Sequence, residues 1–441
     1  MDIIFGNDAE AMNRGKTRPV LWQSQKVING HMLLVGKSGT GKTYTLKQIL
    51  NQLGAQQKNL RVHVMDIHGD IDIQGASTVK FSESTKYGFN PLKINPDPDF
   101  GGVRKRVQSF LSALQRTSRK LGSKQEAALR NILFDLFSAN GFIDGKAETW
   151  VVDDGKQRQY PKKNPTLEDA YKFSQFKLKS MFLGTNSRAA IALEVLNKKV
   201  NQFYVKRKQA AKTAGMTEEE LRKTEMELKK LGEDAVALYQ DYINSVQTGM
   251  ELNDVMKYDS KDVMKSVVER LENLHSIGIF KSEAPPFDPR SSIWRYDIKA
   301  LSMDEKKLFV TFVLESLFQK AVQDGVKDDV VEIIVLDEAH NFLSDDPEDI
   351  TNIIAKEARK FGVALICASQ SPTSFSDDFV SNVGTKIILG IDQMFWDGSI
   401  RKLRLDQKAL EWIVPHQRIL VQINNKGETK NNFAWTILNR G

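Results

Sequence analysis

Apolar runs of strand length alternate with helical patterns at both ends of the chain. Met32–Val35 is a short apolar run, Leu60–Met65 has the length and apolar content of a second strand, and Leu46–Leu50 between them has helical spacing. Buried strands that alternate with helices predict a mostly parallel sheet covered on both faces. Later runs of the same kind stand at Ile293–Ile298, Val330–Leu336, Val363–Ala368 and Lys386–Leu389.

The middle of the chain has a different pattern. Apolar residues recur there at helical spacing, as in Val103, Val107, Leu111 and Leu114, and charged residues fill the positions between them. The chain is therefore expected to have three regions, α/β at 1–95, helical at 96–285 and α/β again at 286–441. A helix over Asp304–Val322 and a strand pair at Arg418–Ile423 and Asn432–Leu438 are expected in the last region.

The composition is that of a globular protein, with 41% hydrophobic and 27% charged residues. No run approaches the roughly 18 apolar residues of a membrane span, and the start lacks the pattern of a signal peptide. The single cysteine, Cys367, excludes an internal disulfide. These features favour a cytoplasmic protein. The net charge of +7 fits a nucleic-acid partner, although it also fits an ordinary basic protein.

A complete phosphate-binding motif follows the first strand. Residues 36–43 match G-x-x-x-x-G-K-[ST] between a strand and a helix. Backbone N–H groups of such a loop turn toward phosphate oxygens, and the helix N-terminus adds partial positive charge. We expect Lys42 to bridge the β- and γ-phosphates of ATP and the Thr43 hydroxyl to ligate Mg²⁺. The expected nucleotide-binding residues are Gly36, Lys37, Ser38, Gly39, Thr40, Gly41, Lys42, Thr43 and Tyr44.

A second motif supplies the acidic half of the site. The apolar run Val330–Leu336 ends at Asp337-Glu338, which is the pattern of a Walker B strand. We expect Asp337 to hold Mg²⁺ through water and Glu338 to polarise the attacking water. Two surface carboxylates after a strand would be the alternative, but the pairing with a complete P-loop favours hydrolysis.

Two polar residues beyond this strand are further candidates. Gln370 ends the next strand and is expected near the γ-phosphate, because adjacent parallel strands bring their carboxyl ends together. Its alternative is a glutamine that caps a loop. Between the two strands, a helix is expected to begin at the N-cap Asp346 and to end at Gly362. Arg359 lies off its buried face, and spacing alone favours a solvated charge there.

Six segments resemble the HerA/FtsK superfamily of ring-forming, DNA-pumping ATPases, and within it the HerA-like branch. They occur in the family's order and span both α/β regions. The segments are residues 29–36, 66–70, 90–92, 337–343, 357–362 and 368–372.

The resemblance implies a RecA-like (ASCE) core with the helical region as an insertion. It also implies a hexameric ring, with ATP at subunit interfaces and duplex DNA in the pore. On that basis Arg359 matches an arginine finger that acts in trans, and Asp66, His68 and Asp70 match a segment beside the γ-phosphate. The family usually has glutamate where Asp70 stands. Its members usually carry a β-barrel before the P-loop, whereas about 30 residues precede the loop here.

A basic stretch in the helical region is a candidate for contact with DNA. Its cations could contact phosphates without reading bases, although a solubilising helix face explains them as well. Between Gly101 and Arg130 the only acidic residue is Glu126, and the basic ones are Arg104, Lys105, Arg106, Arg116, Arg119, Lys120, Lys124 and Arg130.

The leading hypothesis is an ATP-driven DNA translocase or helicase motor. Members of the HerA-like branch often serve a nuclease or other effector, in DNA end processing or in anti-phage defence. No nuclease pattern is visible in this chain, so any cutting would come from a partner protein. The alternatives are a nucleotide-gated assembly scaffold that does not pump DNA, and a secretion or conjugation ATPase of the same superfamily.

Overall fold

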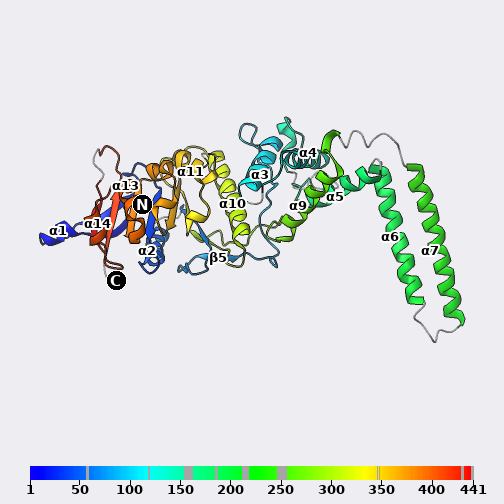
Figure 1. Ribbon diagram of the computed structural model, residues 1–441, viewed down its shortest axis with the longest axis horizontal. Helices are drawn as coiled ribbons and strands as arrows, with labels where there is room; N and C mark the ends of the chain where they lie inside the picture. The colour runs from blue at the N-terminus through cyan, green and yellow to red at the C-terminus, as the bar shows by residue number, and fades with distance from the viewer. Residues whose placement is uncertain are drawn as a thin grey trace. The chain divides into compact units, whose positions relative to one another are not determined.

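The computed structural model describes residues 1–55, 59–117, 120–152, 162–183, 187–210, 218–245, 256–344, 346, 348–428 and 432–438. The chain forms two compact units (Figure 1). The α/β unit comprises residues 1–91, 116–118 and 277–441, and the helical unit comprises residues 92–115 and 119–276. The α/β unit is therefore assembled from both ends of the chain.

One 11-stranded sheet organises the α/β unit, in the order β2-β1-β11-β10-β9-β3-β8-β7-β4-β6-β5. Seven neighbouring strands are parallel to one another, in the order β9, β3, β8, β7, β4, β6 and β5. The remaining neighbours, from β9 through β10, β11 and β1 to β2, pair antiparallel. The strands are β1 (Asp2–Asp8), β2 (Pro19–Gln23), β3 (Met32–Gly36), β4 (Arg61–Asp66), β5 (Ser77–Lys80), β6 (Ile293–Asp297), β7 (Glu332–Leu336), β8 (Val363–Ser369), β9 (Thr385–Gly390), β10 (Arg418–Ile423) and β11 (Ala434–Ile437).

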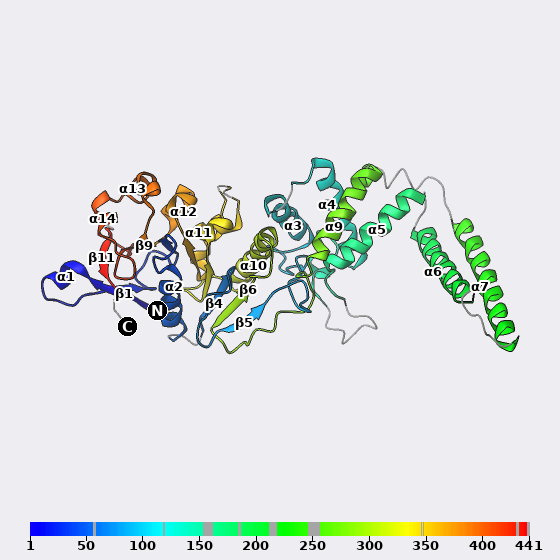
Figure 2. The ribbon, with the colours of Figure 1, turned by 60° about the horizontal axis from the view of Figure 1, so that its bottom comes forward.

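Helices cover both faces of this sheet. Leu46, Ile49 and Leu50 of α2 (Lys42–Gly54) pack against Met32 and Leu34 in the core on one face. Figure 2 shows α11 and α12 on the opposite face. The other helices of the unit are α1 (Ala9–Asn13), α10 (Met303–Gln323), α11 (Ile350–Glu357), α12 (Asp377–Asn382), α13 (Trp396–Leu403) and α14 (Gln407–Trp412).

The parallel part of the sheet brings the carboxyl ends of β3, β4, β7 and β8 to one edge. These strands run into the P-loop, Asp66, Asp337 and Gln370, respectively. The expected mostly parallel α/β fold is thus confirmed. The strands β2 and β5, which lie at the two edges of the sheet, were not expected from the apolar runs.

The helix before β8 differs from the expectation at its start. It begins at Ile350, and its N-cap is Asp349, whose carboxylate accepts from the backbone N–H of Thr351. The predicted N-cap Asp346 instead accepts from the backbone N–H of Glu348, within the turn that precedes the helix. The helix continues through the short 3-10 helix η3 (Ala358–Phe361) and ends at Gly362, which has a left-handed backbone as expected.

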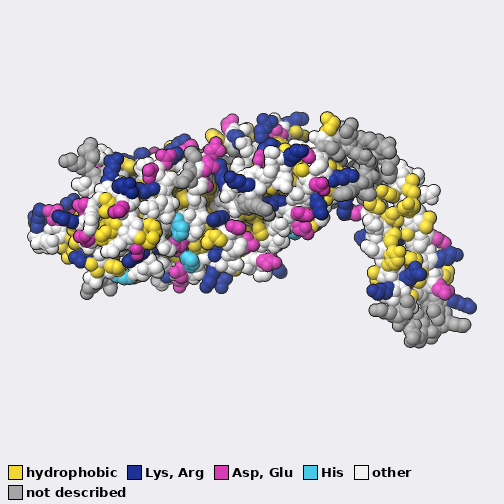
Figure 3. Space-filling view, viewed as in Figure 1, with side chains coloured by type: hydrophobic (Ala, Val, Ile, Leu, Met, Phe, Trp, Pro, Cys, Tyr) yellow, Lys and Arg dark blue, Asp and Glu magenta, His cyan; other side chains and the backbone are white. Residues whose placement is uncertain are grey.

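The helical unit contains α3 (Val103–Thr117), α4 (Ser123–Ala139), α5 (Leu167–Leu183), α6 (Ser187–Ala210), α7 (Glu218–Ser245) and α9 (Lys261–Ser276). Helices α4, α5 and α9 pack on one another, and α6 packs along α7 as a hairpin. Apolar side chains gather on the surface of this hairpin (Figure 3), including the exposed Ile191, Tyr204 and Val236. None of the described helices is long and apolar enough to cross a membrane.

Candidate nucleotide site

The P-loop has the backbone that its glycines permit. Gly39 and Gly41 have φ angles of 79° and 89°, in the left-handed region that side chains avoid. Gly36 approaches Thr40 so closely that a Cβ at this position would lie 2.5 Å from the threonine Oγ1. The Thr40 hydroxyl donates to the carbonyl of Lys37 at 2.8 Å and closes the loop. The loop is thereby fixed directly before α2, whose N-terminus faces a bound phosphate.

A pocket of about 320 Å³ lies over this loop. It brings together residues from the carboxyl ends of four strands and from the C-terminal part of the chain. Its lining residues are Lys37, Ser38, Gly39, Gly41, Lys42, Thr43, Tyr44, His68, Asp70, Asp337, Glu338, Gln370 and His416. Most of the residues expected to bind nucleotide, to ligate magnesium or to act in catalysis therefore share one cavity.

Lys42 and Glu338 form an ion pair inside the pocket. The side chain of Lys42 is 10% exposed and that of Glu338 is 12% exposed, so neither charge is well solvated. The other Glu338 oxygen lies 3.3 Å from Nδ1 of His340, and this ring nitrogen is 3.2 Å from the Ser369 hydroxyl. ATP would have to take Lys42 away from this pair, which would free Glu338 to act on water.

Glu338 has an unusual backbone. Its φ and ψ of 44° and 46° are left-handed, which costs a residue other than glycine on the order of 1 kcal/mol or more. The conformation turns the chain directly after Asp337 and begins a short 3-10 helix at Ala339. The strained turn places the carboxylates of Asp337 and Glu338 in the same cavity.

Asp337 fits the metal role expected for it. The residue is 3% exposed, and its Oδ1 is buried without a hydrogen-bond partner among the described residues. Burial raises the pKa of its carboxyl to about 6, and nearby Lys42 opposes the rise. A buried carboxylate oxygen without a partner, beside the Thr43 hydroxyl in one pocket, is a donor set suited to Mg²⁺.

Asp66 is placed differently from the expectation. Its carboxylate is fully buried and does not line the pocket. One oxygen accepts from the backbone N–H of Gly69 at 2.7 Å, and the other accepts from the Arg295 guanidinium at 2.7 Å. Asp66 thus holds the loop that carries His68 and Asp70 into the pocket, and it is a positioning residue in this structure. Its carboxylate is engaged within the protein interior, and a direct catalytic contact of Asp66 stays a prediction.

Arg359 is exposed on η3 and does not line the pocket of its own chain. An arginine finger acting in trans would have this placement, since its target lies on another subunit. A solvated charge would have it too, so the finger stays a prediction. Gln370 is exposed and does line the pocket.

His416 is a pocket residue that sequence reasoning missed. Its Nε2 lies 3.1 Å from the carbonyl oxygen of Gly39, and its ring lies so close to Gly41 that a Cβ there would be 2.8 Å from Nδ1. His416 has a left-handed φ of 61° in the turn before β10. No motif marks this turn, because its contact with the P-loop arises only when β10 pairs with β9 beside β3.

The basic stretch of the helical region is largely engaged within the molecule. Arg104 pairs with Asp144, Lys124 with Asp259, and Arg130 with Glu126. Arg106 is buried, and Arg116 pairs with Asp346. Arg119 lies outside the described residues. Arg104, Lys124 and Arg130 are thus paired with acidic side chains but remain exposed, and contact of this stretch with DNA stays a prediction.

The fold and the pocket define a RecA-like P-loop ATPase core with a large helical insertion. Comparison with known proteins specifies the type. Residues 11–99 match the family described as the central domain of the helicase HerA. This match and the curated relatives bear out the resemblance of the chain to P-loop ATPases of the HerA/FtsK type, within which it is similar to the HerA-like branch.

Several curated relatives carry helicase names. The DNA double-strand break repair helicase HerA of Saccharolobus solfataricus is 25% identical over 211 residues, which are 45% of this chain and 41% of that protein. A probable helicase of Methanocaldococcus jannaschii is 28% identical over 179 residues, which are 36% of this chain and 33% of that protein. The chain thus matches less than half the length of these relatives.

A solved structure shows the same fold over the whole chain. VirB4 of Thermoanaerobacter pseudethanolicus superposes with a TM-score of 0.59 at 14% identity, and the match covers 100% of this chain and 96% of that one. The likeness supports the RecA-like architecture and not a particular activity.

Proposed function

We propose that the protein is an ATP-hydrolysing motor that moves along duplex DNA or unwinds it, and that it works as a hexameric ring. The observation that carries the proposal is the pocket in which Lys42, Asp337, Glu338 and Gln370 meet over the P-loop. The helicase names of the relatives at this core support DNA as the substrate. A partner nuclease or other effector, in DNA end processing or anti-phage defence, completes the proposal.

In this proposal each pocket residue has one task. The P-loop N–H groups and Lys42 bind the phosphates of ATP, while Thr43 and Asp337 hold Mg²⁺. Mg²⁺ would neutralise charge on the phosphates during transfer to water. Glu338, released from Lys42 when ATP binds, orients the attacking water and accepts its proton. Gln370 and Asp70 line the same pocket and are proposed to act near the γ-phosphate.

Steady-state ATP hydrolysis tests the motor, measured without DNA, with single strands and with linear duplex. Duplex should stimulate hydrolysis, and both Lys42→Ala and Glu338→Gln should reduce the stimulated rate by about 100-fold or more. Glu357→Gln is the matched control, because Glu357 is an exposed glutamate outside the pocket. Hydrolysis that is indifferent to DNA would reject the motor and favour the nucleotide-gated scaffold.

Mixing two inactive variants tests the ring and the arginine finger together. In a ring, a subunit with Arg359→Ala still has Glu338, and a neighbour with Glu338→Gln still has Arg359. Mixed rings should therefore regain part of the activity that each variant lacks alone. Absence of recovery, with assembly of mixed rings demonstrated, would show that Arg359 does not act on a neighbouring subunit.

A further inference from the structure

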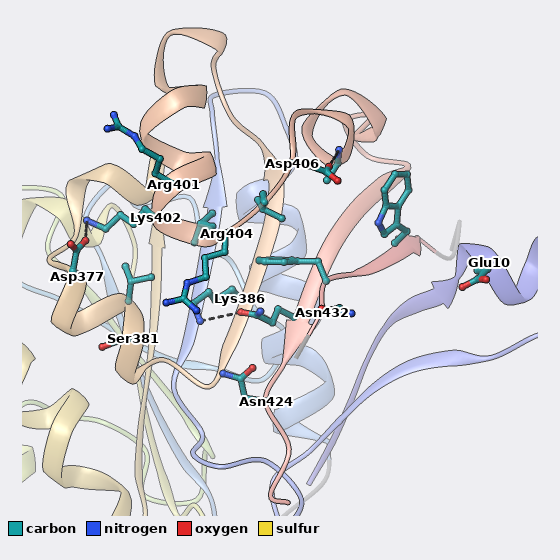
Figure 4. Close-up of a pocket in the computed structure, with 17 residues that line it drawn as sticks. Glu10, Asp377, Ser381, Lys386, Arg401, Lys402, Arg404, Asp406, Asn424 and Asn432 are labelled. Atoms are coloured by element: carbon teal, nitrogen blue, oxygen red, sulfur yellow. Dashed lines mark hydrogen bonds and ion pairs between the residues drawn. The ribbon is translucent and has the colours of Figure 1, made fainter. Parts of the chain in front are cut away.

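The largest cavity described in the α/β unit is separate from the ATP pocket. It has a volume of about 1210 Å³ and shares no lining residue with the ATP pocket. Its walls come from β9 and β10, from the chain around β11, and from α12, α13 and α14 (Figure 4). Neither the P-loop chemistry nor the arginine finger uses this cavity.

Lys386 carries an uncompensated buried charge in this cavity. It lies on β9, is 8% exposed, and donates to Oε1 of Gln422 at 3.1 Å and to the carbonyl of Val383 at 3.2 Å. These two neutral acceptors leave one ammonium hydrogen unused, and no carboxylate pairs with Lys386 among the described residues. Burial lowers the pKa of its ammonium to about 8. A buried cation without an acid destabilises the fold unless an anion joins it.

Arg404 adds a second positive charge from the end of α13. Figure 4 shows its guanidinium directed into the cavity beside Lys386. Its φ of 55° is left-handed, a conformation that glycine adopts freely and arginine does not. An arginine therefore stands at a position whose backbone favours glycine, and its side chain lines this cavity.

The carboxylates that line the cavity are engaged elsewhere. Asp377 pairs with Lys402 at 2.9 Å, Asp406 accepts from the backbone N–H of Ala409 at 2.8 Å, and Glu10 pairs with Arg14. Lys386 and Arg404 therefore set the sign of charge inside the cavity. Lys402 and Arg401 also line the cavity, the first paired with Asp377 and the second donating to the carbonyl of Asp397. Neutral side chains that can donate hydrogen bonds to an anion include Ser381, Asn424 and Asn432.

We propose that this cavity binds the phosphodiester backbone of a nucleic acid. The cations Lys386 and Arg404, with neutral donors around them and the lining acids engaged elsewhere, match the phosphate oxygens that a sequence-independent contact uses. A volume nearly four times that of the ATP pocket suits a segment of polymer better than a single phosphate group. The choice of nucleic acid as the polymer rests on the proposed DNA motor.

The test measures binding of a fluorescent 30-base-pair duplex by anisotropy, using the full-length protein and the variants Lys386→Met and Arg404→Gly. Each variant should weaken binding by about tenfold and make it less dependent on salt, because one phosphate contact is lost. Lys408→Gln is the control, since it removes an exposed cation of α14 that does not line the cavity.

Thermal melting distinguishes a binding role from a structural one. Lys386→Met removes an unpaired buried charge and Arg404→Gly relieves a left-handed arginine, so both should melt at or above the wild-type temperature while they bind DNA less tightly. A drop in melting temperature that accounts for the lost binding would overturn the proposal. So would unchanged DNA affinity in both variants.

Two further measurements separate this site from the motor and from another ligand. If the variants bind DNA less tightly but DNA does not stimulate the wild-type ATPase, the cavity is a DNA site and the proposed motor function is wrong. If DNA stimulates the ATPase of both variants normally and both bind DNA with wild-type affinity, the motor proposal stands and the cavity is not a DNA site. Lys386→Met could also weaken binding of a polyglutamate peptide and leave DNA binding unchanged. That result would overturn the proposal, because the ligand of the cavity would then be an acidic protein segment.

Discussion

The two units of the molecule use their charged residues in opposite ways. In the α/β unit the decisive charges are buried and meet specific partners, as in Lys42 with Glu338 and Arg295 with Asp66. In the α6–α7 hairpin of the helical unit, ion pairs such as Lys199 with Asp234 lie on the surface, beside apolar side chains that are themselves exposed. The comparison indicates that buried ion pairs fix the positions of side chains in the α/β unit, whereas the surface charges of the hairpin mainly keep it soluble.

The largest expected effect tests the buried pair in the α/β unit. Asp66→Asn should lower the free energy of unfolding by about 3 kcal/mol or more, because it leaves the Arg295 guanidinium buried without its partner. Urea unfolding followed by tryptophan fluorescence measures the change. Asp72→Asn is the control, since exposed Asp72 lies 3.6 Å from the same arginine and should cost less than about 1 kcal/mol. Equal costs would contradict the comparison.

An effect of comparable size for each residue is expected from acid. Burial lowers the pKa of His63 to about 3 and that of His31 to about 4, from 6.5 in the unfolded chain. Below pH 6.5 the unfolded chain binds protons that the folded chain refuses, so the α/β unit should lose stability as the pH falls from 6.5 toward 4. For His31 the loss should be roughly 3 kcal/mol at its folded pKa and below.

Urea unfolding at a series of pH values measures this loss, and His63→Gln is the informative variant. Glutamine takes no proton, so the fall in stability between pH 6.5 and pH 4 should be shallower than in the wild type. A slope equal to that of the wild type would show that folding does not lower the pKa of His63.

The smallest effect is expected in the hairpin. Lys199→Met should change the free energy of unfolding by less than about 1 kcal/mol, because its pair with Asp234 is partly solvated. Leu196→Ala, in the same helix, should cost about 2 kcal/mol or more, since Leu196 is 7% exposed. Hydrogen exchange of α6 and α7 by mass spectrometry reports both. A loss of more than about 1 kcal/mol in the free energy of unfolding for Lys199→Met would mean that ion pairs also hold the helices of the helical unit in place.

The sequence predicted the parts of the fold that are local in the chain. Largely apolar runs identified β3, β4, β7 and β8, and the P-loop and Walker B motifs identified most of the pocket. The edge strand β5 was missed because Ser77–Lys80 offers one buried residue, Val79, and no apolar run. The start of α11 was misplaced because two aspartates three positions apart, Asp346 and Asp349, are both good N-caps.

The missing parts of the site depend on contacts between distant segments. His416 meets the P-loop across 377 positions, and the role of Asp66 depends on Arg295, 229 positions away. Lys386 and Arg404 belong to no sequence motif. They became candidates only because the fold brings both into one cavity and gives Lys386 no acidic partner among the described residues. Periodicity and motifs contain no information on such pairings, which the order of strands in the sheet creates.

That order of strands also has a consequence for how the protein is made. β3, which leads into the P-loop, pairs only with β8 and β9, and β8 begins 327 positions after β3 ends. During synthesis β3 and β4 leave the ribosome long before any of their partner strands exists, whereas almost all of the helical unit is contiguous between residues 92 and 276. The helical unit can therefore fold first, while the apolar strands of residues 32–66 wait unpaired and need protection from aggregation.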